Sequence, residues 1–185
     1  MSYNKLFFAI FIFIADLFSQ SAGSFSRIGF DSRTIAIGNS AVALINSPNS
    51  AYHNPATLAF TKNKESNLTF AFLSLDRNFK TLNYLQNIEP RGAFSLGLIS
   101  SGVSNIDKRD SDGSELGNMD IYENQYYLTF ANRFKDNFSA GITIKINHAN
   151  LYDKLSSIIP GFDFGILYSF NDNLNFGLTI KDVYI

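Results

Sequence analysis

The sequence contains no cysteine and no tryptophan, and only four prolines and two methionines in 185 residues. The absence of cysteine excludes disulfides, thiolate metal ligands, a cysteine nucleophile and a lipid anchor on cysteine. A formal net charge of −1 gives no electrostatic reason to expect a nucleic acid as partner. The mean hydropathy of −0.01 is far too low for a bundle of membrane helices. Aromatic residues are abundant instead, with 19 Phe and 9 Tyr, which suggests that apolar and polar residues alternate along the chain.

The first 22 residues have the pattern of a secretory signal peptide. A short start with one lysine, Lys5, is followed by the continuous apolar run LFFAIFIFIA, and then by Asp16 and the small residues of 19–23. Cleavage is expected near Ser21 or Gly23. A single membrane anchor is the alternative, but the run has only about half of the roughly 20 apolar residues that a spanning helix needs. The pattern therefore predicts export.

Residues 23–60 are rich in glycine, serine, alanine and asparagine without strict alternation. The stretch Arg33–Ile45 predicts one short helix with Gly38 as its weak point, and Asn46–Ser50 predicts a turn. Further on, AYHNPATLAF places Asn54 before Pro55. Proline fixes its own φ and pushes the residue before it out of the helical region, so this pair marks a forced corner.

From residue 67 onward, apolar and polar residues alternate with period two, which is the pattern of β-strands with one apolar face. Seven strands are expected: Asn67–Leu75, Asn78–Ile88, Ala93–Val103, Tyr122–Phe134, Phe138–Leu151, Gly161–Phe170 and Leu174–Ile185. Tight turns at 89–92, 135–137 and 171–173 alternate with a long loop, Ser104–Asp120, and a medium loop, Tyr152–Pro160.

Short turns at one end, longer loops at the other and strands of about ten residues are typical of an outer-membrane β-barrel. The polar faces hold mainly glycine, serine, threonine and asparagine, which suits a channel wall. The predicted lipid-facing side chains are Ile142, Ile144, Phe164, Ile166 and Leu178, and those predicted to point inward are Thr143, Lys145, Asp163 and Gly177. An arginine should therefore be tolerated better at Thr143 than at Ile144. The alternative is a soluble exported β-sandwich, whose strands also alternate.

An ordered series of motifs precedes these strands: residues 22–29 (AGSFSRIG), Arg33 with Gly38, residues 41–44 (AVAL) and residues 50–58 (SAYHNPATL). This series resembles the start of the PorV/PorQ family, which is related to the FadL-type outer-membrane transporters. The residues that carry the resemblance over residues 30–60 are Arg33, Gly38, Tyr52, Asn54, Pro55 and Ala56. Thr57 departs from the family pattern, which has glycine there.

The resemblance implies a 14-stranded antiparallel transmembrane barrel whose N-terminal segment, residues 23–60, folds inside as a plug. Asn54 and Pro55 would end the plug and turn the chain into the first wall strand. Residues 61–185 would form the first half of the barrel, about seven of the fourteen strands. Because an odd strand count does not close a single-chain barrel, we expect an N-terminal fragment that forms a curved sheet with two free edges.

The implied function is a component of protein secretion across the outer membrane, of the type IX kind, with secretion-system components or exported cargo as partners beside outer-membrane lipid. Two alternatives stay open: a FadL-like passive channel for hydrophobic small molecules, and a structural envelope barrel. An apolar lumen with a lateral gap would favour the channel. No nucleic acid is expected as a partner.

No catalytic motif is present, so the sequence predicts neither an enzyme nor a bound cofactor or metal. The two histidines, His53 and His148, have no carboxylate neighbours at ligand spacing. The carboxylates of the long loop (Asp107, Asp110, Asp112 and Glu115) do not have the spacing of an EF-hand, and a solvated loop is expected. Four cations are expected to face the lumen or to pair with Asp163 or Glu123: Arg27, Arg33, Arg133 and Lys145. Tyr52, His53 and Asn54 are expected to form a structural turn without ligand contact.

Overall fold

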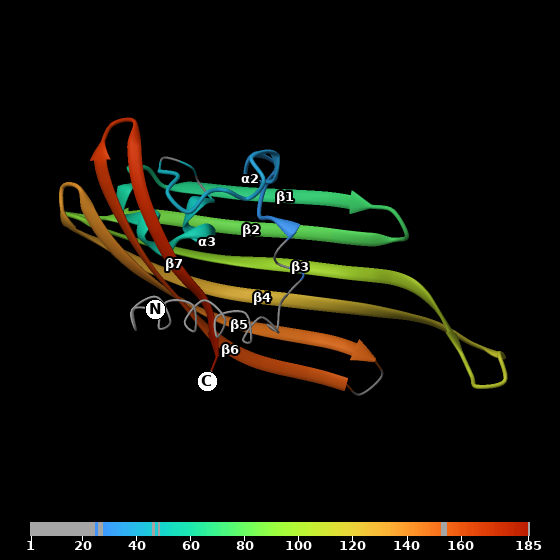
Figure 1. Ribbon diagram of the computed structural model, residues 1–185. Helices are drawn as coiled ribbons and strands as arrows, with labels where there is room; N and C mark the ends of the chain where they lie inside the picture. The colour runs from blue at the N-terminus through green and yellow to red at the C-terminus, as the bar shows by residue number, and fades with distance from the viewer. Residues whose placement is uncertain (1–24, 26–27, 46, 48, 153–154, 185) are drawn as a thin grey trace, which may run out of the picture.

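The computed structural model describes residues 25, 28–45, 47, 49–152 and 155–184, so the predicted signal peptide and Arg27 lie outside the described residues. Seven strands form one antiparallel sheet in chain order (Figure 1). Their bounds are β1 Glu65–Leu73, β2 Arg77–Ile88, β3 Gly92–Arg109, β4 Glu115–Lys135, β5 Phe138–Tyr152, β6 Leu155–Asn171 and β7 Leu174–Tyr184. The sheet is open, with β1 and β7 at its edges, and it confirms the prediction of an all-β antiparallel chain with two free edges.

The predicted loops Ser104–Asp120 and Tyr152–Pro160 are wrong, because strands fill most of both. β3 and β4 stay paired beyond the body of the sheet, with Ile106 opposite Met119, and β6 already begins at Leu155. Figure 1 shows this β3–β4 ribbon projecting past the neighbouring strands. A ribbon with solvent on both faces has no reason to alternate apolar and polar residues, so period two does not reveal it.

The two faces of the sheet are reversed relative to those of a soluble protein. In β4 and β5, Thr129, Thr143 and Lys145 are buried, whereas Leu128 and Ile144 are exposed. The predicted outward positions Phe164, Ile166 and Leu178 are also exposed, at 46%, 44% and 61%, and the predicted inward Asp163 is 3% exposed. Exposed apolar side chains cover all seven strands in this way. In β5 the alternation of the sequence therefore places polar side chains inside and apolar side chains outside, whereas β2 and β3 also bury the apolar side chains Phe79, Leu85 and Ile99 on the inner face.

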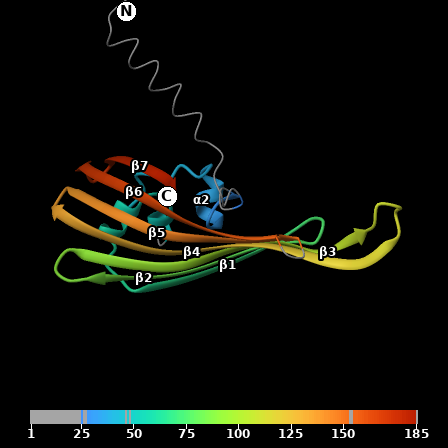
Figure 2. The same cartoon turned by 90° about the horizontal axis from the view of Figure 1, so that it is seen from below.

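The described residues between Phe25 and Phe60, hereafter the inner segment, lie on the concave face of the curved sheet (Figure 2). They contain α2 Ser32–Ala36, α3 Ser50–His53 and the 3₁₀-helix η3 Pro55–Phe60, which contacts β3 to β6. The predicted helix Arg33–Ile45 is too long. It stops at Ala36 because Gly38 and Asn39 both adopt positive φ, at 66° and 60°, which a helix cannot accommodate. None of the helices in the described part of the chain is long and apolar enough to span a membrane.

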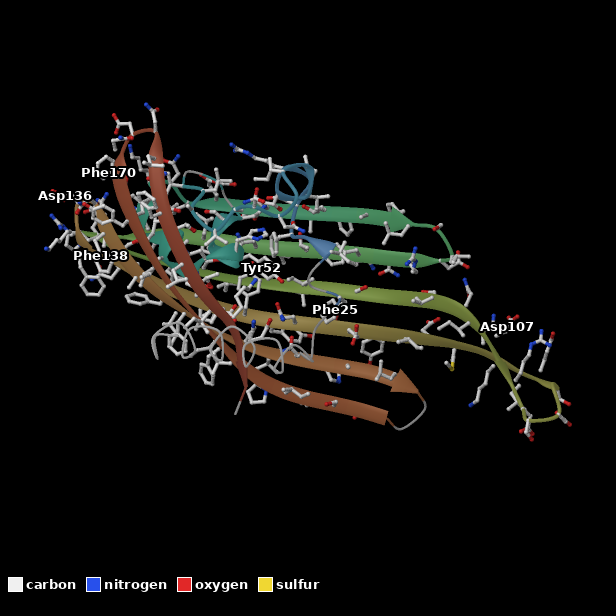
Figure 3. All side chains as sticks on the ribbon, in the orientation of Figure 1. Phe25, Tyr52, Asp107, Asp136, Phe138 and Phe170 are labelled. Atoms are coloured by element: carbon white, nitrogen blue, oxygen red, sulfur yellow. The ribbon has the colours of Figure 1, made fainter. Side chains whose placement is uncertain are left out.

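The buried apolar side chains lie between the inner segment and the sheet. One cluster joins Leu58 of η3 to Leu85 and Ala131 of the sheet, and a second joins Phe25 and Phe30 to Phe79, Ile99 and Tyr127. Figure 3 shows Phe25 and Tyr52 over the sheet, with Phe138 and Phe170 near the tight turns and Asp107 at the opposite end. The described residues form one sheet only, so they do not make the second layer that a β-sandwich requires.

Candidate functional site

The corner at Asn54 and Pro55 joins two short helices on the concave face. Asn54 ends α3 in an extended conformation (φ −148°, ψ 114°), and Pro55 occupies the first turn of η3, where its missing N–H costs nothing. The prediction of a corner is confirmed, but Asn54 and Pro55 do not end the N-terminal segment, contrary to what the resemblance implied. The chain continues through the buried η3, and β1 begins only at Glu65. The inner segment therefore extends beyond the corner.

Asn54 is fully buried and uses its side-chain amide completely. Its Oδ1 accepts a hydrogen bond from the Ala56 N–H at 3.0 Å and so caps η3. Its Nδ2 donates to the carbonyl oxygens of Val42 at 2.7 Å and of Ile166 at 3.0 Å. One side chain thus holds together the start of η3, the stretch before α3 and the wall strand β6.

The wall accepts this corner because three inward positions of neighbouring strands are glycine. A Cβ on Gly141 of β5 would lie 2.6 Å from the carbonyl carbon of Pro55. A Cβ on Gly165 would collide with the Asn54 amide, and one on Gly177 would collide with the Val42 carbonyl oxygen. Gly141 and Gly165 are direct partners in the β5–β6 register. The three glycines form the seat on which the backbone of the inner segment rests, hereafter the glycine seat.

The remaining residues singled out in the sequence are divided between this corner and α2. Ala56 is fully buried, and its carbonyl oxygen accepts a hydrogen bond from Ser139 Oγ at 2.8 Å. Tyr52 packs its ring 5.0 Å from that of Phe30, between centroids. Arg33 is exposed on α2, and Gly38 is exposed just after that helix, where an added Cβ would meet no atom within 4 Å. The structure thus brings Tyr52, Asn54, Pro55 and Ala56 together and leaves Arg33 and Gly38 away from the wall.

A buried ion cluster lies next to the corner. Lys145 of β5 is 3% exposed, and its Nζ lies 2.6 Å from Asp163 Oδ1 and 2.5 Å from Asp182 Oδ1. The pairing of Lys145 with Asp163 confirms one of the two predicted alternatives for this lysine. The sequence pattern does not predict Asp182 as a third member of the cluster. A β-bulge inserts an extra residue in β7 between the partners of Phe162 and Phe164, and this changes which residues point inward. Asp182 has a φ of 60°, and its N–H donates to Asp163 Oδ1 at 2.7 Å.

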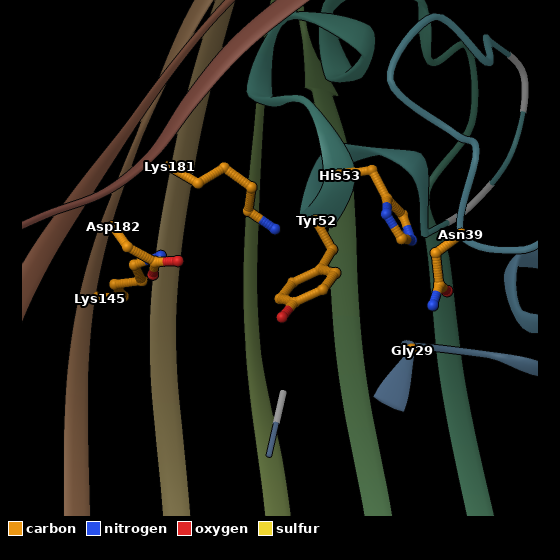
Figure 4. Close-up of a pocket in the computed structure, with 7 residues that line it drawn as sticks. All are labelled: Gly29, Asn39, Tyr52, His53, Lys145, Lys181 and Asp182. Atoms are coloured by element: carbon orange, nitrogen blue, oxygen red, sulfur yellow. The ribbon is translucent and has the colours of Figure 1, made fainter. Parts of the chain in front are cut away.

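A cavity of about 360 Å³ opens between this cluster and α3 (Figure 4). Tyr52 and His53 line one side, Lys145, Lys181 and Asp182 line the other, and Lys181 Nζ lies 4.2 Å from the centroid of the Tyr52 ring. The bulge turns the adjacent residues Lys181 and Asp182 toward the same cavity, whereas successive residues of a regular strand point to opposite faces. No residue type in the sequence signals this change of phase.

His53 is 7% exposed, and its Nε2 has no hydrogen-bond partner among the described residues. Burial, helped by the nearby charge of Lys181 and opposed by that of Asp31, lowers the pKa of His53 to about 4. The imidazole is therefore neutral near pH 7, and a neutral imidazole next to the cavity can donate or accept one hydrogen bond.

The other candidate residues do not meet at this site. His148 lies in β5, where its ring packs 6.0 Å from that of Tyr122. In the ribbon, Arg109 pairs with Asp107 at 3.6 Å and with Glu115 at 3.1 Å. The described residues contain no group of three or more side chains arranged to hold a metal ion. The corner, glycine seat and ion cluster can fix the inner segment against the wall.

Comparison of the sequence with protein-family models and with curated proteins finds no match.

Proposed function

We propose that this chain is part of an outer-membrane β-barrel of the PorV/PorQ kind, with the inner segment as its plug, and that it serves protein secretion. The observation that carries the proposal is the reversed polarity of the sheet. Leu128, Ile144 and Leu178 are exposed at 52%, 47% and 61%, whereas Lys145 and Asp163 are each 3% exposed. Such an outer face suits lipid, and in water it would form an apolar patch far larger than those tolerated on monomers.

The open edges fit the same proposal. An unpaired edge strand in lipid would leave a row of N–H and C=O groups without partners, and only a closed barrel removes that cost. β1 and β7 therefore require further strands beside them in the membrane. We propose the FadL-like fourteen-strand barrel as the closed form, with the described sheet as half of its wall.

Secretion is preferred to a passive channel for hydrophobic molecules because polar side chains line the inner face of β5 and of the facing part of β4, whereas the inward apolar side chains Phe79, Leu85 and Ile99 of β2 and β3 are packed and buried. Gln125, Thr129, Thr143 and Asn147 are buried there and hydrogen-bonded in cross-strand pairs, Gln125 to Asn147 at 2.6 Å and Thr129 to Thr143 at 2.8 Å. An apolar lumen was the feature expected of such a channel. Thr143 is packed as well as polar, so an arginine there would displace buried neighbours, and the expectation that it is tolerated better than at Ile144 stays a prediction.

The membrane part of the proposal is tested with Ile144→Arg, with Ile144→Leu as the matched control. An arginine near the bilayer midplane should lower the stability of the lipid-inserted protein by about 2–4 kcal/mol, and leucine should change it little. The measurement is urea unfolding of protein folded into lipid vesicles. Equal stabilities of the arginine and leucine variants would contradict a lipid-facing Ile144.

The secretion part is tested in cells. Deletion of the gene should deplete a set of exported proteins from the culture medium and raise their amounts in the periplasm, as measured by quantitative proteomics. Complementation with the native gene should restore both. If the medium and periplasm are unchanged while the outer membrane is weakened toward detergent, the structural barrel replaces secretion as the proposed function.

A further inference from the structure

A second cleft, of about 430 Å³, lies at the end of the sheet where the tight turns are found. It is bounded by the β2–β3 turn, by the residues that follow η3 and by the end of β4. This cleft is separate from the cavity beside Tyr52, with which it shares no lining residue. It is also independent of the proposed role in secretion.

Three cations from three parts of the chain line this cleft: Lys62 after η3, Arg91 in the β2–β3 turn and Arg133 in β4. Arg91 pairs with Asp136 at 3.0 Å, from outside the cleft. Glu89 is the one carboxylate in the lining, and within the described residues neither it nor Lys62 nor Arg133 forms an ion pair. Three cations against two carboxylates leave the cleft with a positive excess, which favours an anion.

The Arg133 side chain is held in place by its neighbours, but its guanidinium lacks a hydrogen-bond acceptor at Nε. Its guanidinium carbon lies 5.5 Å from the centroid of the Phe60 ring, and its backbone N–H donates to the Arg91 carbonyl oxygen at 2.9 Å. Its Nε is buried and has no hydrogen-bond partner in the described part of the chain. A buried charged donor without an acceptor is costly, so a ligand oxygen would supply what this group lacks.

We propose that this cleft binds a phosphate group, with Arg133 as the principal donor and Arg91 and Lys62 as supporting cations. A guanidinium presents two parallel N–H groups to two phosphate oxygens, and a lysine ammonium adds a point charge. A phosphate group near pH 7 carries up to two negative charges, whereas a carboxylate ligand carries only one. A site with three cations therefore favours a phosphate over a carboxylate ligand. The phosphate belongs either to a soluble molecule or to a lipid headgroup.

The first test titrates the full chain with inorganic phosphate in a zwitterionic detergent, with sodium chloride of equal ionic strength as the blank, by isothermal calorimetry. The native protein should bind saturably. Arg133→Gln should weaken binding by roughly tenfold or more, since a hydrogen bond to a charged group is lost, and Lys62→Gln should weaken it by less. Lys135→Gln removes an exposed lysine at the same end of the sheet but outside the cleft, and it should bind as the native protein does.

The second test separates the two sources of phosphate. The protein is placed in phosphatidylcholine nanodiscs with or without phosphatidic acid, with no free phosphate, and the thermal midpoint is measured. A rise with phosphatidic acid that Arg133→Gln abolishes assigns the site to a headgroup, and saturable binding of inorganic phosphate alone assigns it to a soluble ligand. Arg133→Lys keeps the charge and loses the planar fork, so it reports on recognition if Arg133→Gln fails to fold. If neither arm gives a saturable effect that depends on Arg133, the proposal is overturned.

Discussion

Gly141→Ala tests the glycine seat most directly. The added Cβ would lie 2.6 Å from the carbonyl carbon of Pro55, where carbon atoms in contact are normally about 3.5–4.0 Å apart. The contact is with backbone on both sides, so about 1 Å of movement is needed and no side chain can rotate away. Overpacking of this kind costs about 1–3 kcal/mol. A shift of Pro55 also strains the hydrogen bond from Ser139 to Ala56, which adds about 1 kcal/mol. We expect a total loss of roughly 2–4 kcal/mol.

The matched control is Gly92→Ala at the start of β3. A Cβ there would meet its nearest atom at 3.4 Å, an ordinary contact, and the smaller entropy of the unfolded chain should make the change neutral or slightly stabilising. Because the chain has no tryptophan, unfolding in urea is followed by far-UV circular dichroism of the lipid-inserted protein. The reasoning is refuted if the two alanine variants unfold at the same urea concentration.

Three other predictions concern the same region. Asn54→Ala removes the hydrogen bonds to Ala56, Val42 and Ile166 and should cost about 2–4 kcal/mol, with earlier proteolytic release of the inner segment; unchanged proteolysis would contradict it. Lys145→Met leaves two carboxylates without their cation and should cost about 3–5 kcal/mol in urea unfolding, whereas the exposed Lys135→Met should cost less than about 0.5 kcal/mol. His53 has a folded pKa of about 4, below its ordinary 6.5, so the unfolded chain binds the proton first. Stability should therefore fall as the pH drops from about 6.5 to 4, by up to roughly 3 kcal/mol, and His53→Gln should reduce that slope; an identical slope would disprove the assignment.

The body of the sheet could be predicted from the sequence because each of its faces meets a different environment. Ile142, Ile144 and Thr143 alternate since one side contacts the inner segment and the other does not, and the pairing of Lys145 with Asp163 follows from that alternation. Where both faces meet solvent, as around Asp107 and Asn118, the constraint disappears and the strands could not be recognised.

The candidate site could be predicted only in part from the sequence pattern. Pro55 fixes a corner locally, but the hydrogen bond from Asn54 to Ile166 depends on which strand passes beneath the corner. The one available signal was the recurrence of glycine at inward positions, at Gly141, Gly165 and Gly177. The bulge at Asp182 reverses the alternation of inward and outward side chains in β7, and no residue type in the sequence predicts it.

The Asn54 amide has a consequence for the order in which the molecule assembles. Its bond to Val42 closes a separation of 12 residues, and its bond to Ile166 closes one of 112 residues. The difference in chain entropy is about 2 kcal/mol for an unstructured chain, while each hairpin of the sheet pairs neighbours close in sequence. The hairpins from β1 to β6 shorten the effective distance step by step, so the corner can take its place only after β5 and β6 have met. The hydrogen bond from Asn54 to Ile166 is therefore expected to form after β5 and β6 have paired, so its presence would indicate that this part of the sheet has formed.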